Sequence, residues 1–140
     1  MFLLDTNVIS ETRKNRPHGG VIEFLTACGD DELLLSAVSI GEIQVGVELT
    51  RSHDPQKAAE IEAWLLKTVE YYPILPLDAA TFRQWALMMH GKSGSLAMDA
   101  MIAATAKVHR LIVVTRNLGD FETFGVPTLN PFTSNSKELS

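Results

Sequence analysis

The sequence predicts one α/β domain whose central parallel sheet is flanked by helices on both faces. Short apolar runs of strand length alternate with longer segments of helical spacing, which is the pattern of such a sheet. The length of 140 residues suits a single domain, and the composition, 46% hydrophobic and 21% charged, is typical of a globular protein. We expect the domain to cover residues 1–132 and a polar, flexible tail to follow at 133–140.

The first elements follow from apolar runs separated by turn residues. Residues 1–4 read as a buried parallel strand, although periodicity alone does not separate this run from a helix segment. Turn and cap residues then start a short helix that ends near Glu11, and the proline and glycines at 17–20 break it. A helix at 21–28 precedes a second strand at 33–35.

The middle elements are predicted from cap residues and prolines. Ser39 can cap the helix after the second strand, and Glu42 three residues later would complete a capping box. Proline suits the first turn of a helix, so residues 55–71 form the next one. The short run 73–77 contains two prolines, which favours a strand at the edge of the sheet.

Two helices and two strands complete the domain. Asp78 caps a helix at 79–90, and a flexible loop follows. Residues 96–108 are apolar nearly all round, which predicts a central buried helix. The run 111–114 is the next strand, and 127–129 forms a last one.

Composition limits the classes of function. No apolar stretch approaches the roughly 20 residues that span a bilayer, so we expect no membrane association and a cytoplasmic location. Cys28 is the only cysteine, which excludes an internal disulfide and argues against a zinc site; its default interpretation is a buried small hydrophobe. The net charge of −5 does not exclude a nucleic-acid partner, because bound cations would offset an acidic cluster.

Four acids lie inside core-forming sequence: Asp5, Glu42, Asp99 and Asp120. For each acid, a purely structural role has to be weighed against a functional one. Asp5 could be an Asx turn or helix cap, Glu42 a capping-box acid, and Asp120 a turn residue. The structural alternative for Asp99 is an acid in the first turn of a helix, but its neighbours leave almost no polar face, which favours a functional role.

Together the four acids indicate a metal site. In open α/β sheets the ligand site lies outside the carboxyl ends of the strands, where Asp5 and the segment around Asp120 both fall. Gathered carboxylates repel by about 4 kcal/mol per pair at 4 Å and an effective dielectric near 20, so a cation is the economical partner. Oxygen ligands select hard ions, which predicts Mg²⁺, with Mn²⁺ as a possible substitute.

Four ordered segments resemble the motifs of PIN-domain ribonucleases, in particular the VapC-like and FitB-like toxins of bacterial type II toxin–antitoxin pairs. The segments are LLDTN at 3–7, SIGE at 39–42, DAMIAATA at 99–106 and TRNLGDF at 115–121. The ending NPF at 130–132 resembles that of FitB-like members, so the resemblance covers nearly the whole chain.

The resemblance implies a PIN-like nuclease domain and metal-dependent hydrolysis of RNA. By it, Asp5 and Asp99 correspond to the principal Mg²⁺ ligands, Glu42 to the third acid and Asp120 to the fourth. Some family members carry an acid where Asn117 stands, which leaves the fourth position open between Asp120 and Asn117; we favour Asp120.

The remaining implications concern supporting residues and partners. Thr115 and Asn117 correspond to polar support for the cluster. Thr6 and Asn7 would orient Asp5 or a water, or act only as turn and cap residues. The implied partners are RNA, a cognate antitoxin protein and a second copy in a homodimer, with operator DNA reached only through the antitoxin. The helices between residues 39 and 71 are candidate dimer or antitoxin surfaces.

Substrate contact must come from basic residues: Arg13, Lys14, Arg16, Lys92 and Arg116. Arg116 lies inside the last motif and is the best candidate for a phosphate ligand; for the others, the interpretation as solvated surface residues is favoured over substrate contact.

Two other classes remain as alternatives. A catalytically silent PIN fold could serve only for binding. A receiver-like phosphoacceptor domain shares the length and the acid after the first strand, but it needs paired acids there and a second aspartate after a middle strand. Residues 33–35 instead lead to Ser36 and Ala37.

Overall fold

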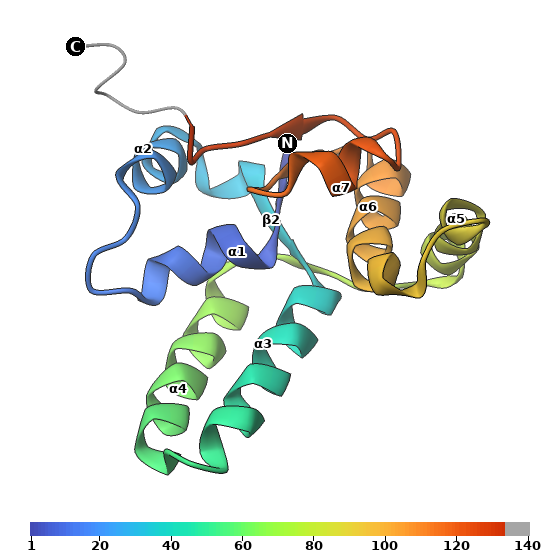
Figure 1. The fold of residues 1–140 in the computed structure, drawn as a ribbon. Coiled ribbons are helices and arrows are strands. Elements are labelled where there is room, and N and C mark those ends of the chain that lie inside the picture. Colours follow the sequence, from blue (N-terminus) through green and yellow to red (C-terminus); the bar gives the residue numbers. More distant parts are fainter. Residues whose placement is uncertain (134–140) are drawn as a thin grey trace.

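Five parallel strands form the central sheet of the computed structural model, which describes residues 1–133 (Figure 1). The strand order is β3-β2-β1-β4-β5, so β1 lies in the middle. The strands are β1 Phe2–Leu4, β2 Leu33–Ser36, β3 Ile74–Leu75, β4 Ile112–Val114 and β5 Thr128–Leu129. β3 is an edge strand, as its flanking prolines predict.

Seven α-helices and three 3-10 segments connect the strands of residues 1–133. The α-helices are α1 Thr6–Ile9, α2 Gly19–Ala27, α3 Ala37–Arg51, α4 Pro55–Tyr71, α5 Ala79–Met89, α6 Ala97–His109 and α7 Leu118–Glu122. The 3-10 segments are η1 Ser10–Arg13, η2 Asp30–Glu32 and η3 Gly94–Leu96. Figure 1 shows α3 and α4 side by side as one helical hairpin and α5 packed beside α6.

Alternating strand residues build a separate core on each face of the sheet. Leu3 and Val113 pack on one face with α6, whereas Leu4 and Val114 pack on the other with α1, α3 and α4. α6 covers its face with fully buried residues, including Ile102, which confirms the prediction of a central buried helix. The helices therefore flank both faces, and the predicted fold class is confirmed.

The structure corrects three local expectations. α3 begins at Ala37, because Ser36 rather than Ser39 accepts the capping bond, from the backbone N–H of Val38 at 3.1 Å. α2 begins at Gly19, inside the predicted break, because the His18 ring caps it through Nδ1. Asp120 lies in the first turn of α7 and not in a turn between elements.

The fold also bears on four other expectations from the sequence. The strand order differs from the 2-1-3-4-5 order of receiver-like domains, which excludes that alternative. Cys28 is only partly buried, at the margin of the core on the α3 side of the sheet, where burial raises the pKa of its thiol. None of the helices in residues 1–133 has the length and apolar character to cross a membrane. The predicted tail, apart from Thr133, lies outside the described residues.

Candidate functional site

The carboxyl edge of the sheet collects the four acids. Asp5 follows β1 directly, Glu42 lies on α3 immediately after β2, and Asp120 lies on α7 after β4. α6 leads into β4 and so runs back across the sheet, which brings Asp99 in its first turn to the same edge. α1, α3, α6 and α7 all begin at this edge, and helix N-termini favour negative charge.

Asp5 is the most constrained of these acids. Its side chain is 4% exposed and accepts hydrogen bonds from the backbone N–H of Thr6 at 2.7 Å, the Thr115 hydroxyl at 2.8 Å and the Asn7 amide at 3.2 Å. Thr115 in turn accepts the backbone N–H of Asn117 at 2.9 Å. The residues predicted to support the cluster thus surround Asp5, although Asn117 contributes its backbone rather than its amide side chain.

Glu42 has no capping role. It is the sixth residue of α3, well past the N-terminal cap at Ser36. Its Oε1 accepts a hydrogen bond from the Thr6 hydroxyl at 2.8 Å, and the same hydroxyl lies 2.9 Å from Ser39 Oγ. The capping-box interpretation of Ser39 and Glu42 is therefore wrong, and Glu42 faces the other acids of the site.

The pKa values of the acids show that the carboxylates act on one another. Burial raises the pKa of Asp99 to about 7, together with the charge of Asp5, a side-chain hydrogen bond with Asp120, and the charges of Asp120 and Glu42. Burial also raises the pKa of Asp5, against the lowering effect of its bonds from Thr115 and Thr6. The pKa of Glu42 is raised by burial and by Asp5, and lowered in part by the Thr6 bond. The structure thus brings all four predicted acids together.

This coupling predicts that Asp99 makes the metal-free protein progressively less stable, relative to a variant without this acid, as the pH rises from about 4 to about 7. Asp99 has an ordinary pKa of 3.8 and a folded pKa of about 7, so between these values the folded state holds a proton that the unfolded state has released. The free energy of unfolding therefore falls through this window, and the penalty is complete above pH 7. Allowing for solvent screening at a partly exposed group, we expect roughly 2 kcal/mol.

Urea unfolding in EDTA at pH 5 and at pH 7.5 measures this effect. Glu11 and Asp78, whose pKa values are lowered by their hydrogen bonds, change stability in the opposite direction. The relevant quantity is therefore the difference between the wild type and Asp99→Asn at each pH. A difference that does not grow with pH would contradict the assignment.

The donor chemistry at this edge fits a hard divalent cation. All four acids offer carboxylate oxygens only, which suit Mg²⁺ or Mn²⁺ better than zinc or copper. Across residues 1–133, no three His, Cys, Asp or Glu side chains form a preformed ligand group. Mg²⁺ needs no such group, because it takes one or two protein carboxylates and keeps several waters.

Among the five basic candidates, Arg116 contacts the acidic site through its backbone, while its guanidinium stacks on Phe132 and its charge acts on Glu11. Its backbone N–H donates to Asn7 Oδ1 at 3.3 Å, and its guanidinium lies 3.8 Å from the centre of the Phe132 ring. Phe132 also meets the His18 ring edge-to-face at 5.1 Å between centroids. The stacked guanidinium keeps its N–H edge available for a phosphate. The resemblance of residues 130–132 to the ending of FitB-like proteins drew attention to Phe132. It did not predict that Arg116 stacks on this ring.

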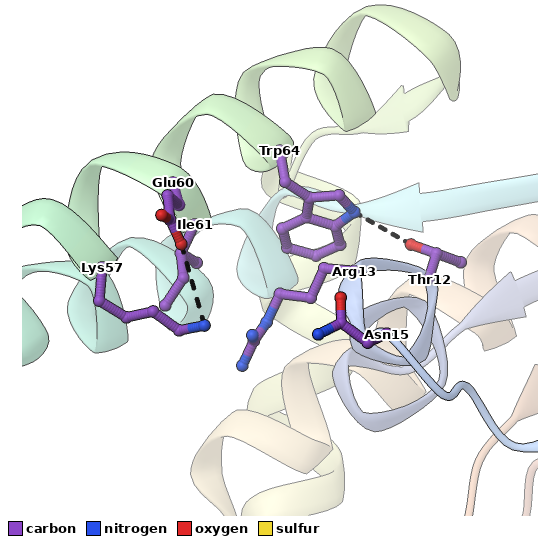
Figure 2. Close-up of a pocket in the computed structure, with 7 residues that line it drawn as sticks. All are labelled: Thr12, Arg13, Asn15, Lys57, Glu60, Ile61 and Trp64. Atoms are coloured by element: carbon purple, nitrogen blue, oxygen red, sulfur yellow. Dashed lines mark hydrogen bonds and ion pairs between the residues drawn. The ribbon is translucent and has the colours of Figure 1, made fainter.

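The other basic residues do not join the acids. Lys14 forms an ion pair with the buried Glu11, and Arg16 and Lys92 are exposed in loops. Arg13 lines a separate polar pocket between η1 and α4, where Figure 2 shows its side chain beside Asn15 and below Trp64. Trp64 Nε1 donates to Thr12 at 3.0 Å across the same pocket. The predicted substrate-binding residues are therefore dispersed over the surface.

The chain is similar in sequence to a protein family and to two known proteins. The model of the PIN domain family matches residues 2–125. The chain is 36% identical over 140 residues to Toxin FitB of Neisseria gonorrhoeae, covering 94% of this chain and 99% of the relative. It is 32% identical over 138 residues to VapC ribonuclease Y4jK of Sinorhizobium fredii, covering 94% and 98%.

Two solved structures are similar to this chain in both fold and sequence. The crystal structure of FitAcB from Neisseria gonorrhoeae superposes with a TM-score of 0.81 at 34% identity, covering 96% of this chain and all of that chain, 100%. A structure of FitAB bound to a DNA fragment gives a TM-score of 0.82 at 32% identity, covering 96% and 98%.

Proposed function

The chain belongs to the PIN-domain family, and from that premise we propose that it is a Mg²⁺-dependent endoribonuclease, the toxin of a bacterial type II toxin–antitoxin pair. The observation that carries the proposal is the coupled group of four carboxylates at the carboxyl edge, with the pKa of Asp99 raised to about 7. Such a group is poorly satisfied without a cation and suits phosphate chemistry with one. Relatives named as a ribonuclease and as a toxin support the choice of substrate and biological role.

Each side chain of the site has a proposed task. Asp5 and Asp99 would hold the ion; when bound, Mg²⁺ polarises a phosphoryl oxygen and lowers the pKa of a water molecule. Thr115 and Thr6 fix the two oxygens of Asp5 through its hydrogen bonds. Glu42 would orient the attacking water and accept its proton.

Asp120 and Arg116 complete the proposed arrangement. Asp120 is hydrogen-bonded to Asp99 and supplies the fourth carboxylate, and the Arg116 guanidinium would bind the phosphate that is cut. In the proposed reaction the water oxygen would bond to phosphorus while the bond from phosphorus to the ribose oxygen breaks; the ribose oxygen would leave with the electron pair and take up a proton from solvent. The chain uses no serine, cysteine or histidine nucleophile in this scheme.

The proposed partners follow from the solved relatives. Because FitAB was solved bound to a DNA fragment, and a neighbour of the same fold from Klebsiella pneumoniae was solved as a toxin–antitoxin complex, we propose that this chain also binds a cognate antitoxin protein and reaches operator DNA through it. We propose a homodimer as its own assembly.

RNA cleavage should depend entirely on a divalent cation. Purified, antitoxin-free protein incubated with labelled tRNA, ribosomal RNA and messenger RNA in Mg²⁺ should give discrete fragments on a denaturing gel, and EDTA should abolish them. Excess Mg²⁺ added after EDTA is the control, because it should restore cutting in the same tube. Cleavage that persists in EDTA would overturn the mechanism, and intact RNA under all conditions would favour a catalytically silent binding fold.

A further inference from the structure

Thr6 links two acids that lie on different elements. Its backbone N–H donates to Asp5 Oδ1 at 2.7 Å, and its hydroxyl donates to Glu42 Oε1 at 2.8 Å. Thr6 is the first residue of α1, and Glu42 lies 36 positions later on α3, which packs against α1. One residue thus holds a carboxylate from each side of the site.

The Thr6 hydroxyl has a single hydrogen and two neighbouring oxygens. Ser39 Oγ lies 2.9 Å away and Glu42 Oε1 lies 2.8 Å away. An ionised carboxylate is the stronger acceptor, so the hydrogen goes to Glu42 when that group is charged. Ser39 is fully buried and is not needed as the helix cap, since Ser36 does that work. The buried Ser39 hydroxyl therefore limits the movement of the Thr6 hydroxyl oxygen toward the protein interior.

Glu42 needs such a restraint. Its side chain is long, only partly buried and repelled by the charge of Asp5, so an unrestrained carboxylate would turn toward solvent. The Thr6 bond opposes this motion from the position that already fixes Asp5.

We propose that Thr6, supported by Ser39, is a positioning residue that holds the Glu42 carboxylate toward Asp5 in the geometry that receives the cation and the attacking water. This inference rests on the proposed function, because it assigns a task within the same acidic site. Partners of this kind typically account for 10- to 100-fold of metal affinity or activity.

The test compares Thr6→Val, which keeps the shape and removes the hydroxyl, with Thr6→Ser, which keeps the hydroxyl. Thr50→Val is the matched control, because the Thr50 hydroxyl bonds only the Gly46 carbonyl of the same helix, at 2.9 Å. Binding of Mn²⁺ is measured by calorimetry without RNA, and kcat and KM are measured with RNA. Thermal melts establish that each variant is folded.

We expect Thr6→Val to weaken Mn²⁺ binding by about 10-fold or more and to lower kcat with little change in KM. Thr6→Ser and Thr50→Val should behave as the wild type, and Ser39→Ala should show a smaller loss than Thr6→Val. In a Glu42→Gln background, Thr6→Val should add little further loss, because its contact is already weakened.

Several results would contradict the inference. One is an unchanged Mn²⁺ affinity in Thr6→Val; another is a loss of equal size in the Glu42→Gln background, which would mean that Thr6 acts through Asp5. Wild-type protein that binds Mn²⁺ but leaves RNA intact would overturn the proposed ribonuclease function alone. Wild-type cleavage combined with normal Mn²⁺ binding by Thr6→Val would overturn this inference alone.

Discussion

Asp99→Asn is expected to abolish RNA cleavage and, in the same protein without metal, to increase stability at neutral pH. The asparagine keeps the shape of the side chain but removes the negative charge that Asp5, Asp120 and Glu42 oppose. Loss of a direct ligand should lower the cleavage rate by at least about 100-fold, more than loss of a supporting group. The relief of repulsion should raise the free energy of unfolding by roughly 2 kcal/mol at pH 7.5.

The two readouts exclude a trivial explanation, because an inactive variant that is more stable has not simply unfolded. Cleavage is followed on gels with Mg²⁺, and unfolding is followed in urea with EDTA. Asp31→Asn is the control. Asp31 is exposed on η2, which precedes β2, so it lies at the amino ends of the strands, opposite the four acids. It should change neither quantity by much. An Asp99→Asn variant that is less stable than the wild type, or that still cuts RNA at the wild-type rate, would contradict the assignment of Asp99 to the metal-binding site.

Phe121→Ala is expected to cause the largest loss of stability, about 3–5 kcal/mol. Phe121 is fully buried in the core that α6 covers, and it follows Asp120 directly on α7. Removing the ring leaves a cavity beneath a helix of only five residues, in which Phe121 is the one buried side chain. We therefore expect cleavage to fall as well, since Asp120 depends on the same helix.

Urea unfolding measures this effect against two controls. Phe121→Leu leaves a smaller cavity and should cost less. Phe82→Ala removes a ring that is 45% exposed on α5, so its loss should be much smaller. A Phe121→Ala loss no larger than that of Phe82→Ala would show that the ring contributes little to the core.

Topology explains why the positions of the acids could be predicted from the sequence. The apolar runs before Asp5 and before the Asp120 segment identify two strand ends, and parallel strands bring such ends to one edge. The apolar surroundings of Asp99 identify a buried helix with one functional face. These signals are local, so one sequence is enough to read them.

The rest of the site depends on contacts between distant residues. Ser36 and Ser39 are both competent caps, and only the pairing of β2 with its neighbours decides that the strand extends to Ser36 and the helix starts after it. The true partner of Glu42 is Thr6, which no pattern around residue 42 indicates. Basic residues were read from proximity in sequence, yet Lys14 turns to Glu11 and Arg13 faces α4.

The hydrogen bond from Thr115 to Asp5 joins residues 110 positions apart, and β1 pairs with β4 across a similar separation. Contacts between residues so far apart in the sequence form slowly, because closing the long loop costs conformational entropy before any stabilising contact is made. A chain still being synthesised therefore carries Asp5 long before it has the strand that holds this acid in place. The acidic site can therefore assemble only after nearly the whole domain has left the ribosome.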